Sequence, residues 1–169
     1  MQTPPQKKFV LFRWIDLTSD FGGVLSALCL LTVTFIISYE VFARYLFSAP
    51  TTWVAEISIY LCMALGLLGA AYALKNNSHF SITIIVDRLT AKNRRRLKIL
   101  TNVMGIAYSL IFIVKGVEMA KFAYDIKDAS TGVLQFPLWI PWSLVPLGGL
   151  LLTLQFINKL AEEFTSRDS

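Results

Sequence analysis

The sequence predicts an all-α integral membrane protein with four transmembrane helices. Of its 169 residues, 55% are hydrophobic and only 16% are charged, whereas soluble domains are about 45–50% apolar and about a quarter charged. The apolar residues gather in four blocks, each close to the roughly 20 residues with which a helix crosses a hydrocarbon core. Because backbone polar groups in lipid must bond within the protein, we expect helices for all four blocks.

We place the four spans at about 21–39, 53–74, 97–117 and 139–160, within one membrane domain that covers residues 1–169. The first block is longer than the apolar core of a signal peptide, and no small-x-small cleavage site follows it directly. We therefore expect it to stay as an anchor. Lys115 and Glu118 intrude at the end of the third block, where long side chains can reach the membrane interface.

The distribution of basic residues predicts the topology. Twelve of the 16 lysines and arginines lie before the first span, between the second and third spans, and after the fourth, and four lie in the other two connections. By the positive-inside rule, both termini and the second connection are expected in the cytoplasm. The net charge of +5 therefore follows from topology, and we reject binding to nucleic acid.

Two kinds of side chain are expected to hold the chain at the membrane interfaces, because tryptophan rings are amphipathic and basic groups meet anionic lipid. These anchors are Trp139, Trp142, Arg88, Arg94, Arg95 and Arg96. In the second connection, apolar residues at 82, 85, 86 and 89 follow helical spacing. We expect a short amphipathic interfacial helix between the second and third transmembrane helices, with a solvated loop as the alternative.

Small residues recur four positions apart along the second span, at Gly66 and Ala70 and again at Gly69 and Ala73. Such pairs let the backbones of neighbouring transmembrane helices approach closely. Packing inside this bundle and docking of another membrane protein explain the pattern equally well, so the sequence leaves both interpretations open.

The sequence shows no enzymatic constellation. Its single histidine, His79, cannot by itself build a His-rich metal site. The two cysteines, Cys29 and Cys62, fall inside apolar blocks, as expected of small buried residues. No P-loop, G-x-S-x-G or HExxH motif is present. We therefore expect no enzyme and no bound cofactor, and a membrane redox subunit is disfavoured.

Glu56 lies one helical turn inside the second span and shares a helix face with Trp53 and Tyr60. Ionisable groups within the membrane are candidates for function. Three interpretations are open: a carboxylate that reaches water, a pair with Arg44, or a salt bridge to a partner subunit. Arg44 also has Glu40 one turn earlier, so its charge can be paired locally.

A set of residues in the middle third of the chain carries a resemblance to a known family. In order, these are Glu40, Arg44, Tyr45, Trp53, Glu56, Gly69, Ala70, Ala71, His79 and Asp87. Together with the four spans and the basic second connection, they resemble the small membrane subunit of tripartite ATP-independent periplasmic (TRAP) transporters, the DctQ-like family. Two adjacent acids often follow the tryptophan in that family. Here the first is Ala55, which weakens any role that needs a carboxylate pair.

The resemblance implies a non-catalytic scaffold subunit of a sodium-coupled secondary transporter in the bacterial inner membrane. The implied partners are a large polytopic DctM-like subunit, which holds the sodium and substrate sites, and a periplasmic DctP-like binding protein. The latter delivers an organic acid such as a C4-dicarboxylate or sialic acid. Candidate contacts with these partners are Arg44, Tyr45, Trp53, Glu56, Gly66, Gly69 and Ala70. A small autonomous transporter or channel that works as an oligomer is the alternative.

Overall fold

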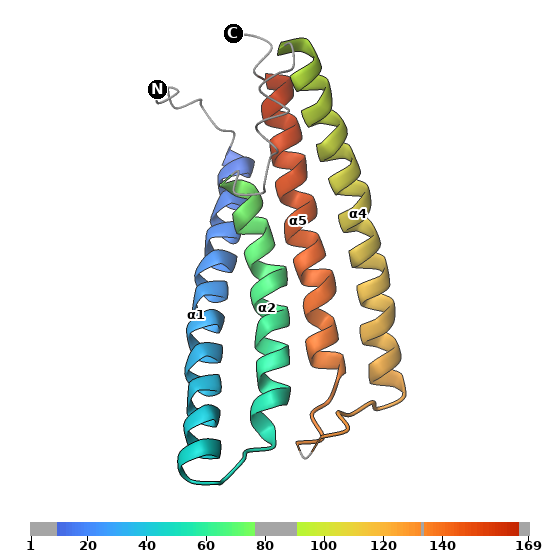
Figure 1. Cartoon of the computed structure of the whole chain (residues 1–169). Helices are drawn as coiled ribbons and strands as arrows, with labels where there is room; N and C mark the ends of the chain where they lie inside the picture. Colours follow the sequence, from blue (N-terminus) through green and yellow to red (C-terminus); the bar gives the residue numbers. More distant parts are fainter. Residues whose placement is uncertain (1–9, 77–90, 133, 166–169) are drawn as a thin grey trace.

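A computed structural model describes residues 10–76, 91–132 and 134–165 as four long helices (Figure 1). They are α1 (Val10–Leu46), α2 (Trp53–Lys75), α4 (Ala91–Asp125) and α5 (Trp139–Thr165). Within these ranges, the β-structure is one isolated bridge between Ala129 and Pro137. Each helix contains a stretch long and apolar enough to cross a membrane. The predicted all-α class and four spans are thus confirmed. The expected interfacial helix around Arg88 lies outside the described residues.

The helices extend beyond the predicted spans, most clearly in α1 and α4. An apolar window marks only the stretch without charges, whereas the helix itself continues through charged residues that pair along it. Arg44 and Glu40 form such a pair at the end of α1, with 2.7 Å between nitrogen and oxygen. Lys115 and Glu118 form another in α4, also at 2.7 Å.

The four helices lie in the order α1, α2, α5, α4 across the bundle, so the last helix in the chain is inside and the third is at an edge (Figure 1). The pairs α1–α2 and α4–α5 make the most extensive contacts, α2 and α5 join the two pairs, and α1 also touches α5. We call the end at which α1 begins and α5 ends the terminal end. The opposite end, where α1 turns into α2 and α4 into α5, is the hairpin end.

Small residues bring α1 and α2 together. A Cβ placed on Gly22 would lie 3.2 Å from the carbonyl oxygen of Leu68. One placed on Gly69 would lie 2.6 Å from the Ser26 hydroxyl oxygen, which donates a hydrogen bond to the Leu65 carbonyl at 3.0 Å. Close approach of backbones, the first interpretation of the small-residue pattern, therefore holds for this helix pair.

Close contacts at glycines also fix α5 between its neighbours. Gly148 packs against Leu67 of α2, where an added Cβ would lie 2.8 Å from the Leu67 Cβ. Toward α4 the contacts are Gly116 against Pro146, Gly105 against Phe156 and Gly149 against Phe112. The seam between α4 and α5 also contains a buried hydrogen bond from the Thr153 hydroxyl to the Ser109 hydroxyl, at 2.8 Å. These contacts set the register of the helices along the bundle.

Candidate functional site

Glu40 organises the connection between α1 and α2 at the hairpin end. One carboxylate oxygen accepts hydrogen bonds from Arg44 Nη2 at 2.7 Å and Nε at 3.2 Å. The other accepts from the Thr51 backbone N–H at 3.1 Å and from the Thr51 hydroxyl. The Glu40 side chain is 11% exposed and the Arg44 side chain 56%. Arg44 is therefore paired locally, as its spacing from Glu40 predicts, while much of its guanidinium faces outward.

Aromatic residues surround this connection. The rings of Tyr39 and Trp53 are stacked, with centroids 6.4 Å apart and an interplanar angle of 29°. This contact holds the first turn of α2 against α1. Tyr45 is 79% exposed, so its ring is available to lipid or to a partner, whereas Trp53 is half-buried.

Glu56 lies beneath the connection between α4 and α5. A Cβ placed on Gly132 would lie 1.0 Å from Glu56 Oε1, so the carboxylate fills the room that the glycine leaves. Its Oε2 is buried, and none of the described residues bonds to it. One turn further along α2, the ring of Tyr60 packs against Phe136 with centroids 5.3 Å apart. Two successive turns of α2 thus contact the connection between α4 and α5.

The connection itself, residues 126–132 and 134–138, is a folded lobe that we call the α4–α5 lobe. Ser130 N–H donates to the Phe136 carbonyl at 2.9 Å, and Leu138 N–H donates to the Asp128 carbonyl at 3.0 Å. Gly132 N–H donates to the Ser130 hydroxyl at 3.1 Å. These bonds give the lobe a fixed shape over α2. The lobe was not predicted from the sequence, although the serine, glycine and proline at 130, 132 and 137 are residues that turns favour.

The small residues of α2 divide into two groups. Gly69 faces Ser26 in the seam with α1, and Ala70 is half-buried. Gly66 has no atom within 4 Å of an added Cβ. The structure therefore brings Gly69 into the bundle and leaves Gly66 on the surface, so only Gly66 is fully open to a neighbouring protein.

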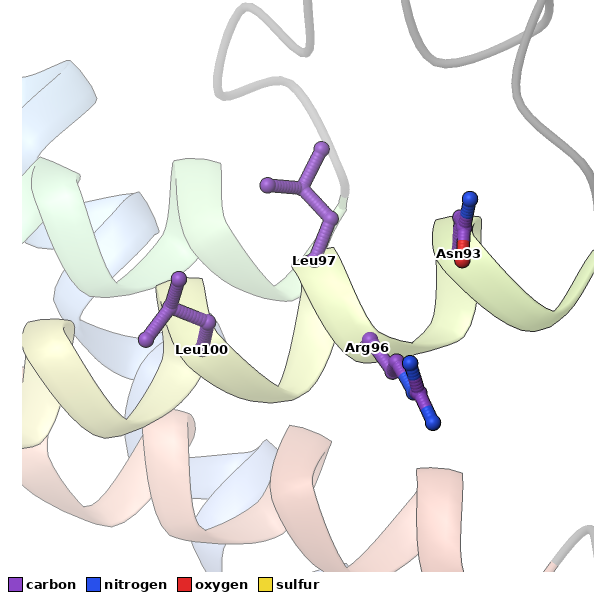
Figure 2. Close-up of a pocket in the computed structure, with 4 residues that line it drawn as sticks. All are labelled: Asn93, Arg96, Leu97 and Leu100. Atoms are coloured by element: carbon purple, nitrogen blue, oxygen red, sulfur yellow. The ribbon is translucent and has the colours of Figure 1, made fainter.

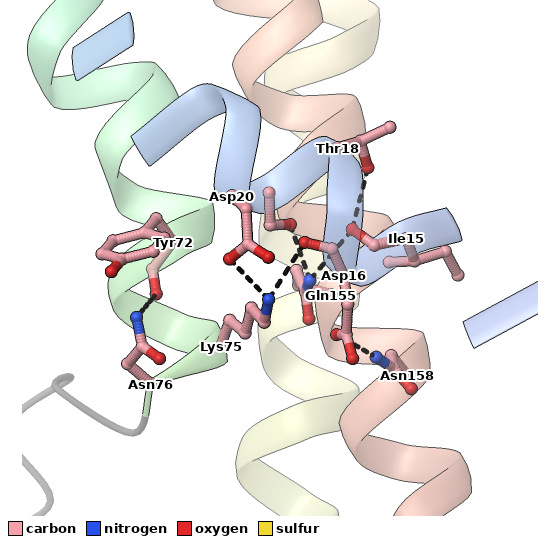
Figure 3. Close-up of polar contacts among 10 residues, drawn as sticks. Ile15, Asp16, Thr18, Asp20, Tyr72, Lys75, Asn76, Gln155 and Asn158 are labelled. Carbon is pink, nitrogen blue, oxygen red and sulfur yellow. Dashed lines mark hydrogen bonds and ion pairs between the residues drawn. The ribbon is translucent and has the colours of Figure 1, made fainter. Parts of the chain in front are cut away.

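A second polar cluster ties three helices together at the terminal end (Figure 3). Lys75 of α2 donates to Asp20 Oδ1 of α1 at 2.5 Å and to the Asp16 carbonyl at 3.1 Å. Gln155 of α5, which is 1% exposed, donates to the Ser19 hydroxyl at 2.6 Å. The cross-helix hydrogen bonding expected of a glutamine inside a span is thus present. The contacts of Asp16, Asp20 and Lys75 between helices were not predicted from the sequence. Charged residues at a span boundary indicate the topology of the chain but not the partners of their side chains.

Two further residues complete this end of the bundle. Asn158 Nδ2 donates to Asp16 Oδ1 at 3.0 Å, and its own Oδ1 is buried without a partner among the described residues. Asn102 of α4 is buried at 8% exposure. Polar side chains therefore lie on the inward faces of α4 and α5 as well as at their ends.

The predicted basic anchors lie at the start of α4. Arg95 Nη2 donates to the Glu163 carbonyl at 2.7 Å, and Lys98 pairs with the Glu163 carboxylate at 2.8 Å. Arg94 and Arg96 are exposed. Arg96 lines a shallow hollow of about 280 Å³ whose described lining, Asn93, Arg96, Leu97 and Leu100, comes from α4 alone (Figure 2). Arg88 lies outside the described residues.

A larger groove of about 450 Å³ lies between α4 and the start of α5, at the hairpin end. It is lined by Lys115, Glu118, Met119, Phe122, Ala123, Asp128 and Trp142. Trp139 packs edge-on against Tyr124 beside it, with centroids 6.0 Å apart. The two tryptophans expected at the interface therefore stand at one end of α5, next to a groove lined by both apolar and charged side chains.

The described residues contain no group of three His, Cys, Asp or Glu that could hold a metal ion. Both cysteines are free. Cys29 is buried as expected, but Cys62 is exposed, because none of the other described helices covers its face of α2. A side chain that faces lipid can be as apolar as one buried between helices, so apolarity alone did not distinguish the two positions.

Comparison with known proteins relates this arrangement to transport. The family profile described as "Tripartite ATP-independent periplasmic transporters, DctQ component" matches residues 33–166. The C4-dicarboxylate TRAP transporter small permease protein DctQ of Rhodobacter capsulatus is 27% identical over 106 residues, which cover 63% of this chain and 46% of the relative. The sialic acid TRAP transporter small permease protein SiaQ of Vibrio cholerae is 26% identical over 125 residues, covering 74% and 70%.

A third relative is a longer protein. The isethionate TRAP transporter permease protein DctMQ of Oleidesulfovibrio alaskensis is 23% identical over 157 residues, which cover 89% of this chain but 24% of the relative. The matches therefore span less than half of the Rhodobacter protein and about a quarter of DctMQ. Since the family profile extends from within α1 through all of α2, α4 and α5, the chain belongs to the DctQ component family of TRAP transporters.

Proposed function

We propose that this chain is the non-catalytic scaffold subunit of a sodium-coupled secondary transporter that takes up an organic acid. In this role it binds a large polytopic DctM-like membrane subunit and helps to receive a periplasmic DctP-like substrate-binding protein. Family membership supports the proposal, as does the match to one section of a longer permease. Four membrane-length helices in a protein of this family place it in the bacterial inner membrane.

The observation that carries the scaffold role is the open arrangement of the bundle. The described helices lie roughly side by side, so α1 and α4 at the edges keep broad apolar faces that none of the other described helices covers (Figure 1). Gly66 adds an uncovered small-residue position on α2. Lipid covers part of such a surface, and we assign another part to the large subunit, because small exposed residues favour close helix packing in membranes.

The proposed orientation puts the terminal end in the cytoplasm. The basic residues at the start of α4 stand at that end, as the positive-inside rule favours. The Glu40–Arg44 network, Glu56 and the α4–α5 lobe then face the periplasm, where a binding protein docks. We assign Arg44, Tyr45, Trp53 and Glu56 to contacts on this side; the contact of Glu56 is made through the α4–α5 lobe, which covers its carboxylate.

The substrate class is an organic acid such as a C4-dicarboxylate or sialic acid. The three relatives are named for three different substrates, so similarity to them supports the transporter class and not one compound. This agrees with a scaffold whose partners hold the selective sites.

The first test is purification of the tagged chain from its native membrane in mild detergent, with mass spectrometry of what accompanies it. A large polytopic protein in stoichiometric amount supports the proposal, and uptake by the reconstituted pair should then require a sodium gradient and the binding protein. If the chain purifies only with itself and alone moves solute across liposomes, it is an autonomous oligomeric transporter instead.

A further inference from the structure

Three helices carry a charge-free stretch bounded by charged residues at both ends. In α1 the stretch lies between Asp20 and Glu40, in α2 between Glu56 and Lys75, and in α4 between Lys98 and Lys115. Each contains 16 to 19 residues, close to the length of a membrane span. The six bounding residues therefore mark where each helix can enter and leave the hydrocarbon core.

Helix α5 contacts the other three helices. Residue positions along α5 therefore allow the heights of these boundaries along the bundle to be compared. At the terminal end, Gln155 bonds to Ser19, which is next to Asp20 in α1. Asp20 in turn pairs with Lys75 of α2. The boundary of α1 and α2 therefore lies level with Gln155. The boundary of α4 comes level with Glu163, the partner of Lys98. The two boundaries differ by eight residues, which is about 12 Å at the helical rise.

The same displacement is found at the hairpin end. Glu56, the boundary of α2, packs against Gly132, which precedes the first residue of α5 at 139. Lys115, the boundary of α4, is next to Gly116, which packs against Pro146. These boundaries differ by at least seven residues of α5, about 10 Å, and in the same direction as at the terminal end. The charge-free band thus runs obliquely across the bundle with parallel edges.

We propose that the lipid bilayer contacts this protein along the oblique band, so that the helices are inclined to the membrane normal by roughly 30°. This angle follows from a shift of about 10–12 Å between α2 and α4, which lie on either side of α5 at about 8–10 Å per helix contact. It is within the range of transmembrane helix tilts. Lysines at the edges can reach the headgroups, which extends the spans.

The proposal accounts for the ion pair of Lys115 and Glu118. Both side chains are about two-thirds exposed, at 66% and 64%, and an exposed ion pair is unfavourable in hydrocarbon but well tolerated in water. In an inclined bundle, α4 from Glu118 to Asp125 stands in the aqueous phase on the hairpin side. The groove between α4 and the start of α5 then opens to water and not to lipid tails.

Two positions at one height along the bundle test the proposal. Leu67 packs against Gly148, so Cys62, five residues earlier on α2, lies level with residue 143 of α5. Gly116 packs against Pro146, so Met119, three residues later on the antiparallel α4, lies level with the same residue. Both are exposed on the bundle surface. An inclined bundle puts Cys62 in lipid and residue 119 in water, whereas an upright bundle puts both at the same depth.

The terminal end offers a reciprocal pair. Ser19 bonds to Gln155, so Leu17, two residues earlier on α1, lies level with residue 157 of α5. Gly105 packs against Phe156, so Met104, one residue earlier on α4, lies level with the same residue. Their exposures are similar, 58% for Leu17 and 65% for Met104. Here inclination puts residue 17, on α1, in water and residue 104, on α4, in lipid. The water-accessible position of each pair is therefore on α4 at the hairpin end and on α1 at the terminal end.

The experiment labels single-cysteine full-length chains in native membranes with a membrane-impermeant maleimide, applied to each side in turn. The variants are C29A, which retains Cys62, and C29A/C62A carrying M119C, L17C or M104C. We expect M119C to react at least about tenfold faster than Cys62, and L17C than M104C, because the reactive thiolate forms in water. Equal rates within both pairs, or faster reaction of Cys62 and M104C, would overturn the proposal.

Two controls keep the result interpretable. After denaturation, all four cysteines should react equally, which shows that differences in membranes arise from depth. If M119C does not accumulate, F122C replaces it, because Phe122 lies one turn further along α4 and is 63% exposed. A partner protein that covers one side of the bundle would protect the same side at both ends and so could not produce the reversal.

Discussion

The Glu56 carboxylate fills the space that a side chain at residue 132 would need, so a Cβ on Gly132 would overlap Glu56 Oε1. A side chain at residue 132 therefore requires the Glu56 carboxylate or the α4–α5 lobe to move. This contact joins the second helix to the connection between the last two, so it couples parts of the chain that are far apart in sequence. It also sets the position of the carboxylate that we assign to a partner contact.

The first prediction concerns this contact. Gly132→Ala should lower the stability of the chain by about 1–3 kcal/mol, because overpacking forces the lobe or Glu56 to move. Thermal unfolding in mild detergent measures the effect. Gly66→Ala is the matched control and should leave the melting temperature unchanged, since no atom lies within 4 Å of its added Cβ. Identical melting curves for the Gly132 variant and the wild type would show that the lobe does not depend on the glycine.

The second prediction compares the contributions of Glu40 and Arg44 to the stability of the chain. Glu40→Ala should lower the melting temperature by a few degrees, because the Thr51 N–H and hydroxyl and the Arg44 guanidinium all lose their acceptor. Arg44→Ala should have a smaller effect on the isolated chain, since Glu40 keeps Thr51 and the arginine is largely exposed. A larger loss of stability from Arg44→Ala would contradict this order.

If Arg44 and Glu56 contact a partner, the double variant Arg44→Ala/Glu56→Ala should reduce uptake by the complete transporter more than it reduces the amount of folded chain. The readout is solute uptake normalised to the protein recovered from the membrane. Uptake at the wild-type level would remove both residues from the proposed interface.

A further prediction uses the hydrogen bond from Gln155 to Ser19. A double-mutant cycle with Gln155→Leu and Ser19→Ala should give a coupling energy of about 0.6 kcal/mol, and of no more than about 1.7 kcal/mol, as such cycles give for bonds between transmembrane helices. Equilibrium unfolding of the four chains in detergent supplies the free energies. A coupling indistinguishable from zero would mean that the packing of α5 against α1, and not this bond, holds the terminal end.

The fifth prediction compares two glycines of one helix. Gly69→Leu should destabilise the isolated chain, because the side chain would meet Ser26, whereas Gly66→Leu should not. Gly66→Leu should instead reduce recovery of the large subunit in pull-downs. If it folds normally and retains full recovery of the partner, Gly66 faces lipid in the assembled transporter.

Hydropathy was sufficient to predict four helices and the residues at which two of them begin. The predicted second and fourth spans start at the observed first residues of α2 and α5. Helices α1 and α4 extend beyond the predicted spans at both ends, because helices held by ion pairs such as Lys115–Glu118 continue after the apolar signal stops.

Which helix contacts which could not be read from the sequence. Lipid and neighbouring helices are equally apolar, so the faces that pack have no distinctive hydropathy. Small residues gave a partial signal, since Gly69 does lie in a seam, yet the similar Gly66 does not. The lobe over Glu56 was missed for a related reason: its contacts depend on the absent side chain of Gly132 and on hydrogen bonds between backbone groups, which leave little trace in composition.

The position of α5 between α2 and α4 has a consequence for biogenesis. During synthesis α1 and α2 emerge first and can pair at once, but α4 then enters the membrane with its main packing partner still unmade. The two halves of the molecule join only when the last helix inserts between them. Assembly of the four described helices is thus completed by α5, and any failure of α5 to insert leaves α4 without its main packing partner.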